Sequence, residues 1–212
     1  DFITSPEVGP LFGTVLANWI DKVWTNLGSP KDFAVLETGA GPGTLARSIL
    51  QAKPESLING RYITIERSEN QRKLHPVEAE SLSSFPEESI TGVVIANELL
   101  DNLPFRLCLG DGEKWREILI TEGFKETTGN EVELPVSLPP IEGAKIPIQT
   151  KANDWVQDVL DIVDQGAVLV FDYCSTTSQM ANEPQSEWLR TYRGHEKGTN
   201  PIANPGSQDI TV

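Results

Sequence analysis

The chain has 212 residues, of which 38% are hydrophobic, so it can bury one sizeable core. Its 17 basic and 31 acidic residues give a formal net charge of -14, which repels a phosphate backbone and argues against nucleic acid as a substrate. No apolar run approaches the roughly 20 residues of a membrane-spanning helix, so we expect a soluble protein without membrane insertion.

The first residue of the chain and its two cysteines say little about the cellular compartment of the protein. It begins at Asp1 rather than Met, so a preceding segment such as a transit peptide stays open. Cys108 and Cys174 lie far apart in sequence and give neither a disulfide framework nor a metal-ligand spacing. We therefore expect a reducing compartment and no metal.

The first predicted element is a helix at residues 11–27. Apolar residues recur there at the spacing of one helical face. Gly28 and Pro30 follow, and both residue types commonly end helices. An amphipathic helix that packs on a sheet is expected.

A strand is predicted at residues 33–37, and a glycine-rich turn follows it. Gly39, Gly41 and Gly43 have the spacing G-x-G-x-G, and residues suited to begin a helix come next. Because glycine has no Cβ, ligand atoms can approach the backbone N–H groups of such a turn closely. We expect a cofactor there, and the alternative is a purely structural corner between strand and helix.

The residues around this turn favour S-adenosylmethionine over a dinucleotide. A dinucleotide site has the spacing G-x-G-x-x-G, whereas Thr44 stands at the third glycine position. Glu37 precedes the turn, where its carboxylate would repel phosphates. S-adenosylmethionine carries an ammonium and a sulfonium and no phosphate, so a carboxylate suits it.

Further strands are predicted at residues 61–66, near Val77, at 90–96 and at 167–172. The first of them ends at Glu66, which can accept hydrogen bonds from both hydroxyls of a ribose. The alternation of strands and helices predicts an α/β fold with a mostly parallel sheet covered by helices on both faces. We expect one domain over residues 1–212.

An inserted region is predicted at about residues 105–150. Residues 105–109 and 115–121 can pair as a hairpin around Gly110, Asp111 and Gly112, and residues 125–148 have the composition of a loop. An amphipathic helix at 152–163 leads into the fifth strand, and the tail at 175–212 is rich in loop residues. We expect His195 in this tail to be a surface or packing residue, since no nucleophile or metal-ligand spacing accompanies it.

Acidic residues follow several of the predicted strands. In an open parallel sheet, ligands bind at the carboxyl ends of the strands, so Glu37, Glu66, Asn97 and Asp172 are expected near one site. Glu98 and Asp101 are three positions apart, which in a helical turn places both carboxylates on one face. They could grip a guanidinium by charge-assisted hydrogen bonds, and the alternative is that they only begin a short helix and face solvent.

Several motifs together resemble the MidA-like class I methyltransferases, and the motif at residues 96–104 is the most specific of them. The motifs are DFITSPE at residues 1–7, Phe12–Gly13, Leu36–Glu37 with the glycine turn, ANELLDNLP at 96–104, FDY at 171–173, LRTY at 189–192 with His195, and GSQDIT at 206–211. The resemblance extends over the whole chain. Thr38 and Cys174 depart from it, since the family usually has an aliphatic residue and a glycine at these positions.

The resemblance implies a Rossmann-like class I methyltransferase sheet, S-adenosylmethionine as cofactor and a protein arginine as methyl acceptor. By position, Glu37, Gly39, Gly41 and Gly43 would line the methionine end of the cofactor, Glu66 its ribose and Glu80 its adenine, with Asn97 also at the cofactor. Glu98 and Asp101 would face the acceptor as catalytic residues.

The family includes mitochondrial arginine methyltransferases of respiratory complex I assembly and bacterial relatives. The location is thus cytoplasmic if the chain is bacterial and the mitochondrial matrix if it is eukaryotic. The family continues beyond the motif at 206–211, so we expect the chain to be truncated at its C-terminus, without an acceptor-binding or dimerising part. The sequence does not decide whether the protein forms a homodimer.

Three hypotheses follow from the sequence. The first is an enzyme that transfers a methyl group from S-adenosylmethionine to an arginine of a protein. The second is an assembly factor that binds the cofactor but has little or no catalysis. The third, a dinucleotide enzyme, is disfavoured by Thr44 and Glu37.

Overall fold

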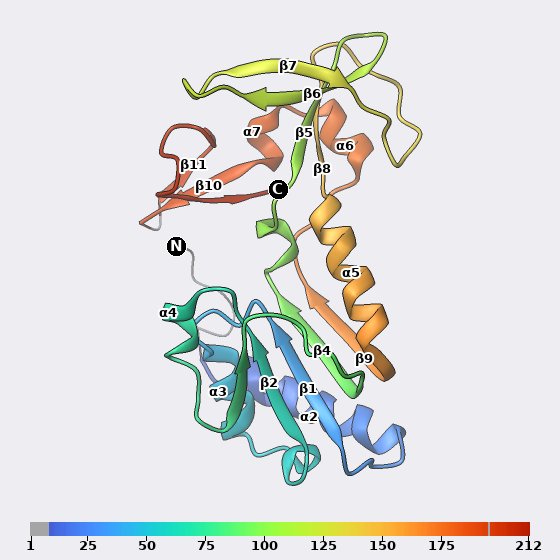
Figure 1. Cartoon of the computed structure of the whole chain (residues 1–212), viewed down its shortest axis with the longest axis vertical. Helices are drawn as coiled ribbons and strands as arrows, with labels where there is room; N and C mark the ends of the chain where they lie inside the picture. Colours follow the sequence, from blue (N-terminus) through green and yellow to red (C-terminus); the bar gives the residue numbers. More distant parts are fainter. Residues whose placement is uncertain (1–8, 195) are drawn as a thin grey trace. The chain divides into compact units, whose positions relative to one another are not determined.

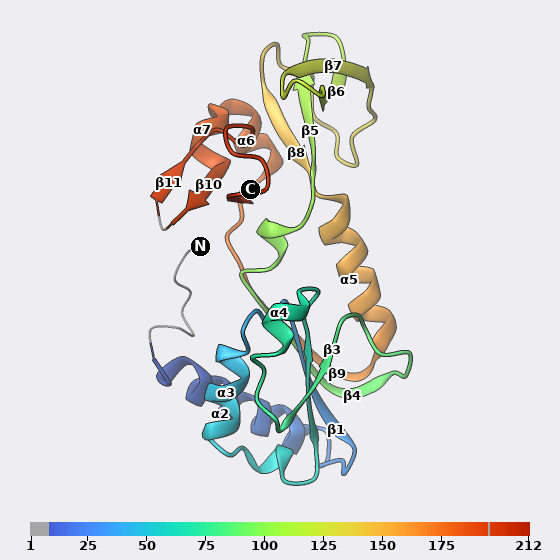
Figure 2. The same ribbon diagram turned by 60° about the vertical axis from the view of Figure 1, so that its left-hand side comes forward.

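The structure is a computed structural model that describes residues 9–194 and 196–212 (Figures 1 and 2). Their contacts divide the chain into two compact units, which we call the parallel-sheet unit (described residues 9–99 and 155–172) and the antiparallel unit (100–154, 173–194 and 196–212). The chain therefore passes between the units after Leu99, after Asp154 and after Asp172. The antiparallel unit contains the predicted insertion together with the C-terminal residues. The motif at residues 1–7 and His195 lie outside the described residues.

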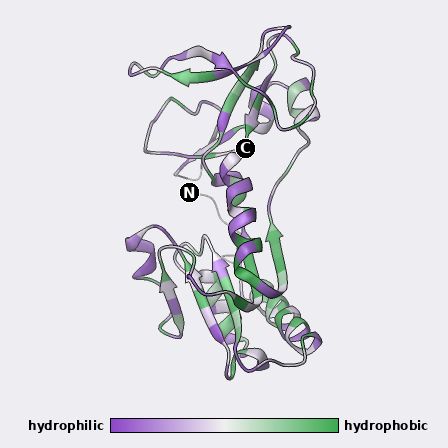
Figure 3. Ribbon diagram, turned by 45° about the vertical axis from the view of Figure 1, so that its right-hand side comes forward, coloured by the Kyte–Doolittle hydropathy of each residue, from purple (hydrophilic) through white to green (hydrophobic). Residues whose placement is uncertain are grey.

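The parallel-sheet unit is built on a five-stranded sheet with the order β3-β2-β1-β4-β9, in which all neighbouring strands are parallel. Its strands are β1 (Phe33–Thr38), β2 (Arg61–Ile65), β3 (Ala79–Leu82), β4 (Ile90–Asn97) and β9 (Val163–Phe171). Figure 3 shows hydrophobic residues along most of this sheet, as expected for parallel strands that are buried on both faces. The predicted fold class is confirmed.

Helices α2 (Leu11–Asn26) and α3 (Thr44–Gln51) pack on one face of this sheet. Phe33 and Val35 of β1 share a core with Leu16 of α2 and Ile49 of α3. Side chains alternate along a strand, so residues such as Leu36 point to the opposite face, and Leu36 is buried there too. Helix α5 (Thr150–Ile162) passes from the antiparallel unit into this one. The remaining short helices of the unit are η1 (Glu55–Leu57) and α4 (Glu69–Arg72).

Two strands of this unit differ from their predicted positions. The third strand begins at Ala79, whereas Val77, which suggested it, is 96% exposed. The fifth strand begins at Val163, directly after α5, instead of at residue 167. The first residues of β9 include polar ones, so the apolar pattern did not indicate where the strand begins. Polar residues are tolerated there because β9 is at the edge of the sheet.

The antiparallel unit contains a four-stranded sheet with the order β7-β6-β5-β8 and a three-stranded sheet with the order β11-β10-β12. Its elements are η2 (Leu100–Asn102), β5 (Arg106–Gly110), β6 (Trp115–Ile120), β7 (Glu126–Glu131), β8 (Lys145–Ile148), α6 (Thr177–Asn182), α7 (Gln185–Trp188), β10 (Arg190–Arg193), β11 (Glu196–Gly198) and β12 (Asp209–Thr211). Its core includes Cys108, Trp115, Ile146 and Leu189.

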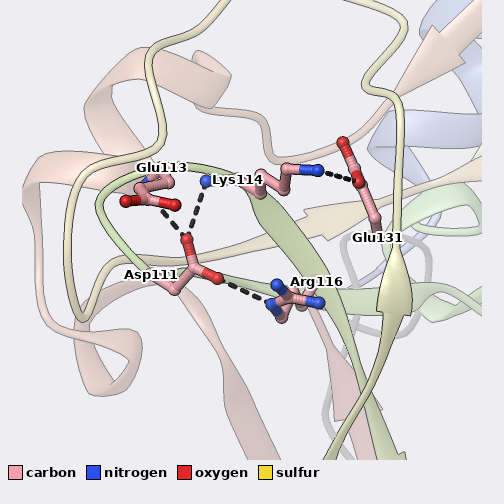
Figure 4. Close-up of polar contacts among 5 residues, drawn as sticks. All are labelled: Asp111, Glu113, Lys114, Arg116 and Glu131. Atoms are coloured by element: carbon pink, nitrogen blue, oxygen red, sulfur yellow. Dashed lines mark hydrogen bonds and ion pairs between the residues drawn. The ribbon is translucent and has the colours of Figure 1, made fainter.

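The predicted hairpin of β5 and β6 is confirmed, and its turn is built on Asp111 (Figure 4). Oδ1 of Asp111 accepts hydrogen bonds from the backbone N–H groups of Glu113 (3.0 Å) and Lys114 (2.7 Å). Oδ2 accepts from Nε of Arg116 at 2.6 Å. Lys114 also pairs with Glu131 on β7.

The predictions of a loop at residues 125–148 and of a loop-rich tail at 175–212 are wrong. β7 and β8 lie in the first segment, and two helices and three strands lie in the second. Nearly all residues of β7 are exposed, so it lacks the apolar alternation that identifies a strand. Pro147 in β8 also argued against a strand, but β8 is at the sheet edge, where a missing backbone N–H is tolerated.

Over the described residues, no helix is long and apolar enough to cross a membrane.

Candidate functional site

The glycine turn after β1 has a backbone that requires glycine. Gly39, Gly41 and Gly43 have φ angles of 67°, 51° and 76°, all in the left-handed region. A Cβ placed on Gly41 would meet no atom within 4 Å, so the space beside this residue is open. α3 begins at Thr44, and no side chain caps its first turn. A ligand can therefore approach the backbone of this turn.

Glu66 lies against the turn, as expected from its place at the end of β2. Its Oε2 accepts a hydrogen bond from the backbone N–H of Gly41 at 3.0 Å, and its Oε1 accepts one from the N–H of Ser68 at 2.7 Å. A carboxylate offers about four acceptor positions, so these two hydrogen bonds leave capacity for ligand hydroxyls. The structure thus brings Glu66 and Gly41 together.

Glu37 is the last but one residue of β1 and is buried, with 4% of it exposed. Its Oε2 accepts a hydrogen bond of 2.7 Å from the hydroxyl of Tyr62. Desolvation by burial raises the pKa of Glu37 from 4.5 to about 7, although the Tyr62 hydrogen bond and the charge of Arg47 act in the opposite direction. Its expected contact with the methionine end of the cofactor stays a prediction.

The end of β4 forms an elbow beside the glycine turn. Asn97 is the last residue of β4, and Glu98 then adopts a left-handed φ of 50°, which is strained for a residue with a Cβ. The N–H of Glu98 donates to the carbonyl of Phe171 at 2.7 Å, and the N–H of Leu99 donates to Oδ2 of Asp172 at 3.1 Å. The ends of β4 and β9 thus hold the elbow jointly.

Leu99 joins this elbow to the glycine turn. A Cβ on Gly39 would lie 2.8 Å from Cδ1 of Leu99, which is closer than any real contact. A side chain on Gly39 would therefore require Leu99 to shift. Because Asn97, Glu98, the glycine turn, Glu66 and Asp172 all belong to the parallel-sheet unit, the predicted convergence of strand ends is observed within it.

The predicted helical face that would join Glu98 and Asp101 is wrong. The short helix η2 begins only at Leu100, and Glu98 has a left-handed backbone. Asp101 belongs to the antiparallel unit, where it is 6% exposed and its Oδ1 accepts a hydrogen bond from Asn102 at 2.8 Å. A residue with positive φ breaks the i to i+3 geometry on which the prediction depended.

Glu80 does not lie at the carboxyl end of its strand. It pairs in register with Ile63, and its carboxylate lies 3.6 Å from the guanidinium of Arg61 at the beginning of β2. The adenine contact that the resemblance implies for Glu80 stays a prediction.

Asp172, expected near the site from its place at a strand end, accepts a hydrogen bond from the N–H of Leu99. His75 is a residue of the site that the sequence analysis missed. His75 donates to the turn from outside any recognisable motif, at 2.8 Å from the carbonyl of Gly41. No sequence signal identifies His75, because its partners come from three different segments.

The arrangement suits a ligand with hydroxyl groups. Open space lies beside Gly41, and the Glu66 carboxylate beside the turn can accept further hydrogen bonds. Among the described residues, no cluster of His, Cys, Asp or Glu could hold a metal ion.

The comparisons with known proteins agree with this geometry. Residues 15–212 match the model of a family described as "Putative S-adenosyl-L-methionine-dependent methyltransferase". The chain is 26% identical over 260 residues to the protein arginine methyltransferase NDUFAF7 homolog, mitochondrial, of Drosophila melanogaster, covering 100% of this chain and 57% of the relative. It is also 26% identical over 266 residues to the protein arginine methyltransferase NDUFAF7, mitochondrial, of Xenopus tropicalis, covering 100% of this chain and 58% of that relative.

A solved structure is similar as well. A COG1565 superfamily member from Burkholderia thailandensis bound to S-adenosyl-homocysteine matches with a TM-score of 0.80 and 25% identity, covering 100% of this chain and 59% of that chain. The chain thus spans less than two thirds of the length of each of these proteins. The resemblance drawn from the motifs is confirmed, and the chain belongs to the family of S-adenosyl-L-methionine-dependent methyltransferases that this model describes.

Proposed function

We propose that the parallel-sheet unit binds S-adenosylmethionine and that the whole protein transfers its methyl group to an arginine of a protein substrate. The observation that carries this proposal is the glycine turn, whose three left-handed glycines leave open space at Gly41 while Glu66 holds the Gly41 N–H. The relatives named as protein arginine methyltransferases support the choice of acceptor.

The residues at the carboxyl edge of the sheet fit this cofactor. Gly39, Gly41 and Gly43 would admit the methionine end to the backbone, and Glu66 would accept hydrogen bonds from the ribose hydroxyls. Asn97, at the end of β4, would contact the cofactor from the neighbouring strand. Bound S-adenosylmethionine supplies an electrophilic methyl group on its sulfonium. Glu37 would act by holding Tyr62 in place.

Glu98 and Asp101 are our candidates for the acceptor. Glu98 lies at the strained elbow beside the glycine turn, a kind of position that is often reserved for function. A carboxylate there would orient a guanidinium and balance its charge until a proton leaves. Since Asp101 is in the other unit, its role depends on the assembled protein.

Calorimetry with S-adenosyl-homocysteine and with NAD tests the cofactor assignment. We expect S-adenosyl-homocysteine to bind and NAD not to bind, because Thr44 stands at the third glycine position of a dinucleotide site. Tighter binding of NAD than of S-adenosyl-homocysteine would overturn the proposal.

Paired measurements on Glu98→Gln and Asp101→Asn test the acceptor assignment. Both changes nearly keep the size of the side chain and remove its charge, so methyl transfer to an arginine-containing protein should fall at least tenfold, with S-adenosyl-homocysteine affinity nearly constant. Glu88→Gln, which alters an exposed acid of the parallel-sheet unit, is the matched control.

The full-length protein is used, with transfer followed by mass spectrometry. Wild-type rates in both variants would exclude the two acids from acceptor binding, and loss of cofactor binding would assign them to the donor site. A wild type that binds S-adenosyl-homocysteine but methylates no protein would favour the assembly-factor hypothesis.

A further inference from the structure

We propose that His75 is a positioning residue that fixes the conformation of the glycine turn for the cofactor; this inference deepens the proposed function. His75 follows α4 in the connection between β2 and β3. Its imidazole makes hydrogen bonds from both ring nitrogens, and their partners come from the turn, from β2 and from β3. One side chain thus ties the turn to two strands of the sheet.

The contacts determine which nitrogen carries the proton. Nε2 lies 2.8 Å from the carbonyl oxygen of Gly41, and a carbonyl only accepts, so Nε2 must be protonated. Nδ1 lies 2.7 Å from Oγ of Ser81 and 2.9 Å from Oγ1 of Thr64. A hydroxyl can donate to a bare Nδ1 or accept from a protonated one, so the contact with Gly41 is kept in either charge state of the ring.

Both backbone polar groups of Gly41 are therefore hydrogen-bonded to side chains. Its N–H donates to Glu66 and its carbonyl accepts from His75, so both peptide groups that flank its Cα are fixed. The ring also lies against Gly43, where an added Cβ would be 3.1 Å from Cδ2 of His75. A left-handed glycine is free to leave its conformation, and these contacts restrict that freedom before a ligand arrives.

Two variants separate the hydrogen bond to Gly41 from the other contacts of the ring. His75→Gln places an amide nitrogen at the position of Nε2 and keeps a donor to Gly41, whereas His75→Asn places its amide near Nδ1 and keeps only the contacts with Ser81 and Thr64. We expect the Asn variant to bind S-adenosyl-homocysteine at least tenfold more weakly than the wild type. The Gln variant should stay within threefold of it.

The same comparison distinguishes positioning from a general effect on the fold. The midpoint of thermal unfolding without ligand is expected to change by a similar amount in the two variants, since each loses part of the hydrogen-bond network. Their affinities for S-adenosyl-homocysteine are expected to differ. Equal affinity in the Asn variant and the wild type, or equal losses in both variants, would overturn the proposal.

A second measurement needs no ligand. The chain has only two histidines, so a His195→Gln background leaves His75 as the single histidine signal in nitrogen NMR. We expect a protonated Nε2, and faster amide exchange at Gly41 and Gly43 in the Asn variant than in the Gln variant. A protonated Nδ1 with a bare Nε2 would overturn the proposal. If the wild type binds no S-adenosyl-homocysteine, the proposed function fails, and this measurement still decides the role of His75.

Discussion

At the residue scale, the site depends on glycines that cannot be replaced. Gly41 has a φ of 51° and open space where a side chain would point. Gly143, in the antiparallel unit, is a matched control, because its φ is 79° and its added Cβ would also meet nothing within 4 Å.

We expect Gly41→Val and Gly143→Val each to lower the free energy of unfolding by about 1–2 kcal/mol, the usual cost of a left-handed conformation for a residue with a Cβ. Only Gly41→Val should abolish binding of S-adenosyl-homocysteine, since its side chain would fill the space in front of the turn. Calorimetry and chemical denaturation of both variants check this. Full affinity in a folded Gly41→Val protein would mean that the turn is only structural.

Glu37 makes the stability of the protein depend on pH. Burial raises its pKa from 4.5 to about 7 in the folded state, so the folded chain binds more protons than the unfolded chain between these values. The contribution is fully present below about pH 4.5 and is lost as the pH rises through about 7. A shift of this size corresponds to about 3 kcal/mol.

We therefore expect Glu37→Gln to be less sensitive to a change from pH 5 to pH 8 than the wild type. The uncharged amide can still accept the hydrogen bond from Tyr62, and it has no proton to lose. Urea denaturation at the two pH values gives the free energies. An identical pH dependence in wild type and variant would contradict the raised pKa of Glu37.

At the element scale, the β5–β6 hairpin depends on one carboxylate in its turn (Figure 4). The backbone N–H of Lys114, the side chain of Arg116 and the backbone N–H of Glu113 lower the pKa of Asp111 from 3.8 to about 2. Because the folded pKa is depressed, the stabilisation is present above about pH 4 and is lost as the pH falls through about 2.

Asp111→Ala should speed amide exchange in β5 and β6 at neutral pH, because two backbone donors and Arg116 lose their acceptor. It should also remove the acid-dependent loss of hairpin stability between about pH 4 and pH 2. Glu113→Ala is the control, since Glu113 contributes only its backbone N–H. Equal exchange rates in the two variants would show that the Asp111 side chain does not hold the turn.

At the scale of the whole molecule, charge is the strongest long-range property. These 212 residues have a formal net charge of -14, and a negative charge of this size favours the approach of basic groups over that of phosphates. Such attraction between exposed charges is screened by salt, with a Debye length of about 30 Å at 0.01 M and about 3 Å at 1 M.

We expect methyl transfer to a basic, arginine-containing peptide to fall several-fold between about 0.05 M and 0.5 M salt, through a rise in KM. Transfer to the same peptide with acidic flanking residues should be slow at both concentrations. Affinity for S-adenosyl-homocysteine, measured in parallel, should change little. Equal rates for the two peptides at low salt would show that net charge does not select the acceptor.

The sequence by itself determined the parallel sheet, the glycine turn and the place of Glu66. Local patterns carry these features: buried strands have apolar runs, a left-handed turn needs glycine, and parallel strands end at one edge. The hairpin around Asp111 was predictable for the same reason, because its turn residues are adjacent in the chain.

Only the tertiary structure decided the surroundings of these residues. Burial raises the pKa of Glu37, and the left-handed backbone of Glu98 separates Glu98 from the short helix that contains Asp101. Glu80 lies near Arg61. His75 reaches Gly41 from a segment 34 residues away. Such contacts depend on where distant segments meet, and no periodicity or spacing in one segment carries that information.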